Sequence, residues 1–275
     1  MILSATDYEF VQNLLLERAA IRISTEQEYL VRSRLEPVAK QAGLSDLRAL
    51  VEQLRREPYG PLHSQVVEAM TTNETSFFRD IHPFETLKIH VLPEVISRKG
   101  SDHTLRIWSA ACSTGQEPYS LAMLIAEMPT LKSWRVQIVA TDLSRTTLAK
   151  AQQGTYNSLE IGRGVPARML TQYFDRVGTS FQVKAQLRGM IEWRQLNLAG
   201  RWPTLPVFDL VFIRNVLIYF PPATNETVLR AARGVMHPQG YLFLGTTENM
   251  LGLSTGFETV TRGKTMFYRP ATRKG

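Results

Sequence analysis

The stretch WSAACSTGQEPYS, residues 108–120, decides the fold expected for this chain. An apolar run ends abruptly at small and polar residues, and helix-forming residues then begin. A strand that passes into a helix through a glycine, here Gly115, is typical of nucleotide-binding α/β proteins. The stretch lacks the G-x-G-x-x-G of dinucleotide sites and the G-x-x-x-x-G-K-[ST] of P-loops. It carries an acid instead, Glu117, two residues after the glycine.

The rest of the C-terminal part repeats this pattern of strands and helices. Apolar, β-branched or aromatic runs predict four strands, at 104–111, 135–144, 207–216 and 240–248. Helical sequence follows the first two, at 117–128 and 145–154, which argues for a mostly parallel sheet. The last run turns at Arg262-Gly263-Lys264 and predicts a terminal antiparallel hairpin. Alternating residues further predict a small antiparallel β-subdomain at about 165–200.

The N-terminal part is predicted to be all-helical. Apolar spacing predicts four helices: 5–20, 26–42, a third that is N-capped by Ser45 and ends before Pro58, and 61–72. Pro37 is expected to disturb the second helix or to break it early. The fold class is therefore α/β, with a helical domain and linker over 1–80 and a Rossmann-like domain over 81–275.

Composition bounds the class of protein. The chain has 275 residues, of which 44% are hydrophobic and 21% charged, as in ordinary soluble globular proteins. No apolar run approaches the roughly 20 residues that cross a bilayer, and the N-terminus does not resemble a secretory signal. The single cysteine, Cys112, fits a reducing cytoplasm. The five histidines lack metal-ligand spacing, so no metal is expected.

Charge is distributed unevenly along the chain. The net charge is +7; residues 1–79 carry 9 Lys/Arg and 11 Asp/Glu, whereas residues 80–275 carry 23 and 14. A basic surface favours an anionic partner such as nucleic acid, acidic lipid or an acidic protein. Charge alone does not distinguish among these partners. It is equally consistent with a basic surface that keeps the protein soluble and binds no partner.

Two acids follow the first two predicted strands, where ligands of open α/β sheets bind. Glu117 either stabilises the start of its helix or faces a ligand, where it would suit a cation, an ammonium group or a hydroxyl. Asp142 either caps the helix that begins near Ser144 or binds ribose hydroxyls. Together with the Gly115 turn, they favour a ribose-bearing ligand with positive charge. S-adenosylmethionine fits both properties.

Five segments in sequence order resemble the CheR-type chemotaxis receptor methyltransferases. These segments are MTTNETSFFRD (70–80), WSAACSTGQEPYSLAM (108–123), ATDLSRTTLAKAQQGTY (140–156), FDLVFIRNVLIYF (208–220) and GYLFLGTTE (240–248). The family consists of S-adenosylmethionine-dependent protein-glutamate O-methyltransferases, and the resemblance covers nearly the whole chain. It implies methyl transfer to glutamate side chains of membrane chemoreceptors, with S-adenosylhomocysteine as product, for adaptation in bacterial chemotaxis. The domain at 81–275 is then the methyltransferase domain.

The resemblance also implies the site residues. The expected cofactor-binding residues are Asn73, Thr75, Arg79, Gly115, Glu117, Asp142, Asn197, Leu198, Arg214 and Asn215. Glu117 is assigned to the ammonium end, Asp142 to the ribose, and Asn197-Leu198 to the side of the adenine. Arg79 and Tyr219 are the expected catalytic residues, with a helix-surface arginine and a core aromatic as the respective alternatives.

The chemistry expected of such an enzyme needs no general base. A glutamate side chain has a pKa of about 4.3, so it is already a carboxylate at neutral pH. Catalysis would then consist mainly of alignment and of removing water from the nucleophile. This agrees with a sequence that offers no convincing catalytic histidine or cysteine.

The expected partner is the cytoplasmic helical domain of a chemoreceptor, whose acidic surface suits a basic enzyme. Arg32, Arg34 and Lys40 are the candidate docking residues of the N-terminal part, although that part is net acidic. Some relatives grip a pentapeptide at a receptor C-terminus; the short loop in DRVGTSFQV (175–183) predicts docking that is independent of it. The protein is expected to be a cytoplasmic monomer, recruited to receptor arrays at the membrane without inserting into it.

Two alternatives remain from the sequence. One is a non-enzymatic cofactor-sensing or scaffold domain of receptor arrays. The other is a nucleic-acid methyltransferase, suggested by the basic charge. Enzymes that act on exocyclic base amines usually carry [DN]PP[FY] where this chain has IRNVLIYF (213–220), and the chain lacks an aromatic–basic stacking stripe, so no nucleic-acid partner is expected.

Overall fold

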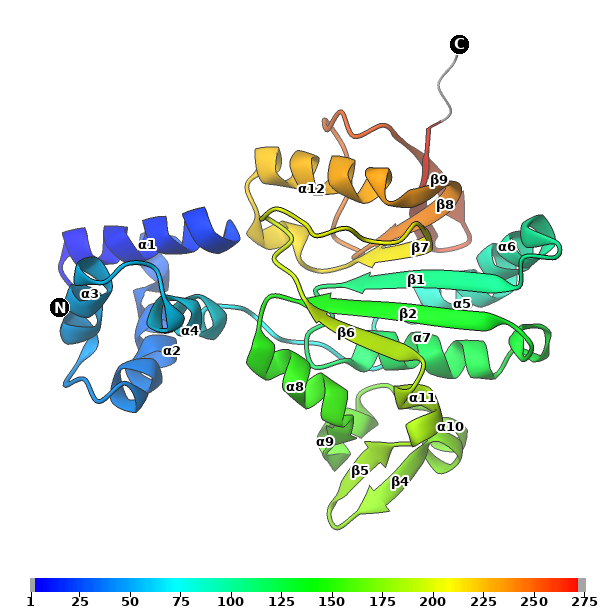
Figure 1. The fold of residues 1–275 in the computed structure, drawn as a ribbon, viewed down its shortest axis with the longest axis horizontal. Coiled ribbons are helices and arrows are strands. Elements are labelled where there is room, and N and C mark those ends of the chain that lie inside the picture. The colour runs from blue at the N-terminus through cyan, green and yellow to red at the C-terminus, as the bar shows by residue number, and fades with distance from the viewer. Residues whose placement is uncertain (1–2, 272–275) are drawn as a thin grey trace. The chain divides into compact units, whose positions relative to one another are not determined.

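The computed structural model describes residues 3–271, which form two compact units (Figure 1). The smaller unit comprises the chain up to Thr72 together with two later segments, Ala199–Arg201 and Tyr219–Asn225. The larger unit holds Asn73–Leu198, Trp202–Ile218 and, within the described residues, the chain from 226 to 271. The segment between Asn73 and Asp80 therefore belongs with the larger unit.

The smaller unit contains the four predicted helices, which are confirmed. Their bounds, with a 3₁₀ turn before the second, are α1 (Ala5–Ala19), η1 (Thr25–Gln27), α2 (Glu28–Gln41), α3 (Leu47–Arg56) and α4 (Pro61–Ala69). Helices α1 and α2 each contact both α3 and α4. Each helix contributes a fully buried side chain to the core between them: Leu15, Val31, Leu50 and Val66. The apolar spacing of the sequence thus marks the faces that pack.

Two details of these helices differ from the prediction. The N-cap of α3 is Asp46 and not Ser45, because the Asp46 carboxylate accepts the Ala49 N–H at 2.8 Å. Helix α2 continues through Pro37 without a break. Proline removes one helical hydrogen bond, to the carbonyl of Ser33, but both residues are exposed, so water can hydrate that carbonyl. The buried face of α2 keeps the helix intact.

The larger unit is built on a seven-stranded sheet in the order β6-β2-β1-β7-β8-β10-β9. The strands are β1 (Thr104–Ala110), β2 (Arg135–Asp142), β6 (Ile191–Gln195), β7 (Phe208–Ile213), β8 (Met236–Leu244), β9 (Phe257–Arg262) and β10 (Thr265–Pro270). The first five in spatial order are parallel, and β10 is antiparallel to β8 and β9. Every residue of β7 is buried, so both faces of the sheet are covered at its centre. The predicted fold class is confirmed.

Helices flank this sheet and follow its strands. Those outside the β-subdomain are α5 (His82–Thr86), a π-helical segment η2 (Leu87–Val91), α6 (Leu92–Lys99), α7 (Gln116–Ala126), η3 (Pro129–Leu131), α8 (Arg145–Gln153), η4 (Leu217–Tyr219) and α12 (Pro222–Gly234). Helix α8 contacts β2 and β6, α7 contacts β2, and α5 contacts β10. The helices α7 and α8 confirm the two predicted crossovers.

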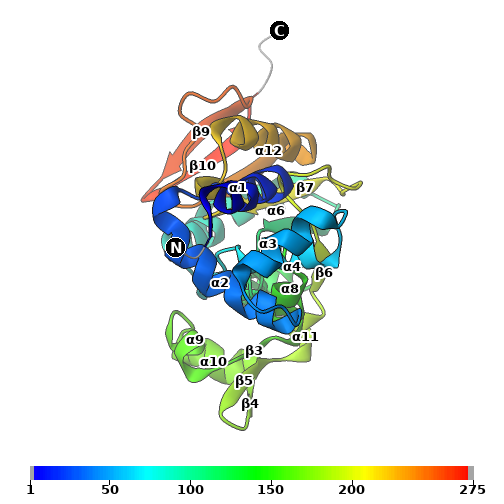
Figure 2. The ribbon, with the colours of Figure 1, turned by 90° about the vertical axis from the view of Figure 1, so that its left-hand side faces the viewer.

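The small β-subdomain is present but was misplaced by the prediction. Figure 2 shows it as a three-stranded sheet with short helices beside it. Its elements are β3 (Thr155–Tyr156), α9 (Ser158–Gly162), α10 (Ala167–Tyr173), β4 (Phe174–Val177), β5 (Ser180–Val183) and α11 (Ala185–Arg188). The alternating run Ile191–Gln195 is not part of it, because this run forms β6 and pairs in parallel with β2. A half-exposed edge strand shows the same alternation in either sheet.

Neither a membrane span nor a metal site is found in the described part of the chain. No helix within residues 3–271 is both long enough and apolar enough to cross a membrane. Within the same residues, no group of three or more His, Cys, Asp or Glu side chains is arranged to hold a metal ion.

Candidate functional site

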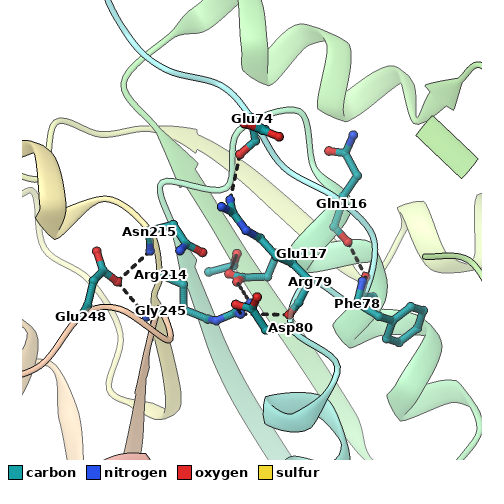
Figure 3. Close-up of polar contacts among 12 residues, drawn as sticks. Glu74, Phe78, Arg79, Asp80, Gln116, Glu117, Arg214, Asn215, Gly245 and Glu248 are labelled. Atoms are coloured by element: carbon teal, nitrogen blue, oxygen red, sulfur yellow. Dashed lines mark hydrogen bonds and ion pairs between the residues drawn. The ribbon is translucent and has the colours of Figure 1, made fainter. Parts of the chain in front are cut away.

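The carboxyl ends of the five parallel strands meet at one edge of the sheet, and predicted site residues follow four of them. Glu117 lies beyond β1, Asp142 ends β2, Asn197 follows β6, and Arg214 and Asn215 follow β7. This is the edge at which open α/β sheets bind ligands. Figure 3 shows the charged cluster at this edge, in which Glu117 lies beyond β1, Arg214 follows β7 and Glu248 follows β8, beside Arg79 and Asp80 of the segment before α5.

The turn after β1 has a strained backbone. Ala111 (φ 53) and Ser113 (φ 50) are left-handed, as is Gly115 (φ 95). The N–H of Ser113 donates to Asp142 Oδ2 at 2.8 Å, and its Oγ donates to the Asn73 carbonyl at 2.8 Å. Two other parts of the unit therefore hold the turn in a conformation that non-glycine residues rarely adopt.

Gly115 is required by packing inside the unit. A Cβ on this residue would stand 2.9 Å from Ala151 Cβ, 3.0 Å from Tyr156 Oη and 3.1 Å from Trp193 Cη2. Its own N–H donates to the Cys112 carbonyl at 3.0 Å. The sequence suggested that the glycine lets backbone approach a ligand, whereas the space beside it is occupied by side chains of this unit. Its contact with a cofactor stays a prediction.

Asp142 is a buried acid that organises the end of β2. It is 7% exposed, and its Oδ1 accepts the Ser144 N–H at 3.0 Å. The N-cap of α8 is Ser144, whose Oγ accepts the Thr147 N–H at 3.1 Å. The alternative in which Asp142 caps this helix is therefore wrong. Its carboxylate instead ties the turn after β1 to the loop after β2.

Glu117 and Arg214 form a buried ion pair, which the sequence did not predict (Figure 3). Arg214 Nη1 donates to Glu117 Oε2 at 3.0 Å, and Ser109 Oγ donates to the other Glu117 oxygen at 2.7 Å. Arg214 Nη2 donates to Asp80 Oδ2 at 2.8 Å and to the Arg79 carbonyl at 2.9 Å. The Arg214 side chain is only 2% exposed, so these carboxylates compensate a buried charge. Glu117 thus does more than stabilise the start of α7.

The segment that carries Arg79 is strained as well. Phe78 (φ 48), Asp80 (φ 69) and Ile81 (φ 48) are left-handed, which is unfavourable for Ile81 in particular because it is β-branched. Arg79 lies within this turn, before α5, so the alternative of a helix-surface arginine is wrong. Its guanidinium points away from Asp80 and donates to the Glu74 carbonyl at 3.0 Å (Figure 3). The Arg214 bonds hold the turn and thereby place Arg79.

Glu248, like Asp80, is a charged residue at this edge that sequence reasoning missed. Asn215, in the loop after β7, has a left-handed backbone (φ 57). Contacts from outside the loop must hold this conformation. The Glu248 carboxylate, 5% exposed, provides these contacts by accepting backbone N–H groups. The donors are Gly245 and Asn215 to Oε2, both at 2.7 Å, and Val216 (2.9 Å), Leu217 (2.7 Å) and Ile218 (3.4 Å) to Oε1. The only sequence signal was an acid shortly after a buried strand.

The remaining predicted residues differ in exposure. Asn73 is exposed, Thr75 and Asn197 are half-buried, and Leu198 is buried with its carbonyl accepting Trp202 Nε1 at 3.0 Å. Tyr219 is half-buried and belongs to the segment that clusters with the smaller unit, where its carbonyl accepts the Arg22 N–H at 3.3 Å. Its place near a transferred methyl group, like its alternative as a core aromatic, stays a prediction.

Cys112 lies in the turn after β1 but is not activated. Burial raises the pKa of its thiol well above the ordinary value, and the negative charges of Asp142 and Glu117 raise it further. The thiol is therefore neutral at neutral pH, whereas a cysteine nucleophile needs the thiolate. Cys112 is therefore not a candidate nucleophile.

The groups at this edge fit S-adenosylmethionine. The carboxylates of Glu117 and Asp142 and the Asn197 amide suit hydroxyl and ammonium groups. Glu117 already accepts two hydrogen bonds, and a carboxylate has about four acceptor positions, so it can accept more. An acid stands at the start of α7, where diphosphate sites present backbone N–H groups to a negative ligand.

Comparison with known proteins covers almost the whole chain. Residues 6–71 match the family model described as "CheR methyltransferase, all-alpha domain", and residues 73–266 match "CheR methyltransferase, SAM binding domain". The chain is 44% identical to chemotaxis protein methyltransferase 1 of Pseudomonas aeruginosa, over 96% of this chain and 97% of that protein. It is 42% identical to chemotaxis protein methyltransferase Cher2 of Pseudomonas putida, with the same coverage. Identity to the chemotaxis protein methyltransferase of Escherichia coli is 32%, over 97% and 92% of the two chains.

Proposed function

The chain belongs to the CheR methyltransferase family, an S-adenosylmethionine-dependent family, and from this premise we propose that it methylates glutamate side chains of membrane chemoreceptors. The proposal rests on the hydrogen bonds at the strand ends of the matched SAM-binding domain. There Arg214 bonds to Glu117 and to the Arg79 carbonyl, and Asp142 bonds to the turn after β1. The products are glutamate methyl esters and S-adenosylhomocysteine. The names of the relatives support a role in chemotaxis, where such methylation serves adaptation.

Cofactor binding is assigned to the carboxyl edge of the sheet. In this proposal Asp142 binds the ribose hydroxyls and Glu117, oriented by Arg214, binds the ammonium group. Asn197 and Leu198 lie beside the adenine. The other proposed cofactor-binding residues are Asn73, Thr75, Arg79, Gly115 and Asn215. The hydrogen bond from Ser113 to Asn73 supports the proposal, because it joins the 73–80 segment to the turn after β1.

The reaction asks for positioning rather than for acid–base chemistry. S-adenosylmethionine, when bound, supplies a methyl group on a positively charged sulfur. A substrate glutamate is already ionised at neutral pH, so the protein needs only to orient its carboxylate and exclude water. The Arg79 guanidinium suits this task, because it is half-buried and Arg214 fixes the turn that carries it. Tyr219 is the second candidate for holding the substrate.

Docking to the receptor is proposed to use the basic surface of the larger unit. Among the docking residues expected in the smaller unit, Arg32 pairs with Glu36 at 2.6 Å, and Arg34 donates to the Met70 carbonyl at 2.7 Å. These internal bonds make the helical unit a weaker candidate. Because Val177 pairs with Ser180, the β4–β5 loop has only two residues, which supports pentapeptide-independent docking. We further propose a cytoplasmic monomer that is recruited to receptor arrays.

The proposal is tested by two measurements on Asp142→Ala and Arg79→Ala. Calorimetry with S-adenosylhomocysteine reports cofactor affinity, and tritiated-methyl transfer to receptor fragments reports activity. We expect both variants to lose about 100-fold in methyl transfer, as for removal of one charged group from a preorganised site. Asp142→Ala should also lose cofactor affinity. Normal turnover in both variants would refute the site, and cofactor binding without transfer by the unmodified protein would favour a cofactor-sensing domain.

A further inference from the structure

A hollow of about 320 Å³ opens beside the strained turn of the larger unit. Its lining residues are Glu74, Thr75, Ser76, Arg79 and Arg163. Four of them come from the segment before α5. The fifth, Arg163, follows α9 in the small β-subdomain and is not among the residues assigned to the site above.

The fold fixes Arg163 beside this segment through its neighbour, Gly164. Gly164 has a φ of 145°, and a Cβ on it would stand 2.0 Å from the Phe77 carbonyl oxygen. The two backbones are therefore in direct contact, and only glycine permits it. The Phe77 ring in turn packs edge-on against Tyr156 and Phe174 of the small sheet, with centroids 4.9 and 5.7 Å away. Arg163 thus stands one residue from an anchored contact.

The Arg163 side chain has no internal partner among residues 3–271, unlike Arg168 and Lys184 of the same subdomain. Arg168 pairs with Glu127, and Lys150, which precedes the subdomain, pairs with Glu160. The Arg163 side chain is exposed and makes no hydrogen bond or ion pair with any residue between 3 and 271. A guanidinium without a partner at the rim of a hollow is available to an anion from solution.

The lining of the hollow carries a positive excess. The lining residues include two arginines, Arg79 and Arg163, and one acid, Glu74, and the hydroxyls of Thr75 and Ser76 add neutral donors. This set of groups suits a carboxylate, which accepts strong hydrogen bonds from guanidinium groups. A neutral amide of the same shape keeps only one acceptor oxygen and has no negative charge, so it would bind these groups more weakly.

We propose that Arg163 acts with Arg79 to hold the carboxylate of the glutamate to be methylated, so that Arg163 is a substrate-recognition residue. The inference rests on the proposed methyl transfer to glutamate and deepens it. It assigns the choice of glutamate over glutamine to the small β-subdomain. Arg163 binds the substrate and contributes nothing to cofactor affinity.

The test compares Arg163→Gln with Arg176→Gln. Arg176 lies on β4 of the same subdomain and does not line the hollow, so its variant removes the same charge elsewhere. Binding of two receptor fragments, with glutamate or glutamine at the methylation site, is measured in the presence of S-adenosylhomocysteine. We expect the unmodified protein to prefer the glutamate fragment at least tenfold, and Arg163→Gln to lower this preference at least fivefold. Arg176→Gln should keep it, and Arg163→Lys should restore part of it.

Several outcomes would overturn the inference. They are an unchanged preference in Arg163→Gln, an equal loss in Arg176→Gln, and the absence of any preference in the unmodified protein. Cofactor affinity and thermal midpoint, measured on each variant, should match those of the unmodified protein; a loss of either would make Arg163 structural and also contradict the inference. Failure of the unmodified protein to methylate either fragment would instead contradict the proposed function, so the two failures are distinguishable.

Discussion

The two ends of the parallel strands both bury carboxylates beside basic groups, but they are built differently. At the amino end, Asp209 is 3% exposed, pairs with Lys99 at 3.1 Å and accepts the Arg106 N–H at 3.0 Å. At the carboxyl end, Glu117 pairs with Arg214 at 3.0 Å, and Glu248 accepts backbone N–H groups. A buried ion pair is therefore present at both ends and does not by itself mark a functional site.

Backbone strain separates the two ends. Seven described residues other than glycine have positive φ, and six of them lie at the carboxyl end: Phe78, Asp80, Ile81, Ala111, Ser113 and Asn215. Such conformations cost about 1–3 kcal/mol each and persist only where surrounding contacts impose them. At the carboxyl end these contacts come from Asp142, Arg214 and Glu248. Strain held by charged groups, rather than charge alone, thus distinguishes the proposed site.

The largest effect is expected from Glu248→Ala. The change leaves several buried N–H groups without an acceptor and releases the strained loop at Asn215. We expect a loss of about 3–5 kcal/mol in stability, the range for a broken buried network. Thermal unfolding monitored by circular dichroism measures it. Glu248→Gln is the control, because it keeps one acceptor oxygen and should lose less.

If Glu248→Ala melted like the unmodified protein, the loop after β7 would not depend on this carboxylate. The carboxyl end would then hold its strain in some other way, and the contrast between the two ends would disappear. Methyl transfer measured well below the melting temperature should also fall, because Arg214 and Asn215 begin the same loop.

Asp209→Asn should have the next largest effect, and this effect should be on stability alone. The change leaves the Lys99 ammonium, 10% exposed, without its closest carboxylate. We expect a loss of about 3 kcal/mol, as for other buried pairs broken on one side. Affinity for S-adenosylhomocysteine, measured at a temperature where the variant is folded, should not change. A loss of affinity would show that the two ends are coupled.

Glu117→Gln should lower both stability and cofactor affinity, each to an intermediate extent. From the sequence alone, lost affinity with an unchanged melting temperature would identify a ligand-binding acid. The structure predicts that both fall, because Glu117 also compensates the buried Arg214. Asp80 continues to pair with Arg214, so the loss of stability should be only about 1–2 kcal/mol, with roughly tenfold weaker S-adenosylhomocysteine binding by calorimetry. Asp80→Asn is the control, and it should leave cofactor affinity nearly unchanged.

The sequence predicted those parts of the fold that depend on local pattern. Apolar runs located β1, β2 and β7, and helical spacing located α1 to α4. The prediction failed where the answer depends on distant partners. The alternation in Ile191–Gln195 predicts a strand but not the sheet that it joins, which pairing with β2 decides.

The same limit applies to the site. Glu117 and Asp142 were predicted because each follows a strand, and Arg214 because of the family resemblance. The pairing of Glu117 with Arg214 was not predicted, since 97 residues separate them. Glu248 and Asp80 lay inside quoted segments and received no role, because no spacing links an acid to backbone N–H groups in another loop. Gly115 was predicted for this turn, but its packing against Tyr156 and Trp193 was not, since these residues come from other elements.

The smallest effect is expected at the amino end, from His237 on β8. Burial lowers the pKa of this histidine, and the nearby Arg98 and Lys99 charges lower it further, against an opposing effect of Asp209. Its Nδ1 accepts the Gln239 N–H at 3.0 Å, a bond that a proton on this nitrogen would break. The unfolded chain therefore binds this proton at higher pH than the folded chain does.

The sign of the pH dependence follows from that difference. The stabilisation from neutral His237 is complete above about pH 6.5, the ordinary histidine pKa, and is lost as the pH falls through the lower folded value. His237→Gln should remove the contribution of this residue to the dependence of stability on pH. The melting temperature of the variant should therefore fall less between pH 7.5 and pH 5.5 than that of the unmodified protein. Other titrating groups affect both proteins equally. Equal slopes would show that the amino end is insensitive to this proton, and methyl transfer should be unchanged in either case.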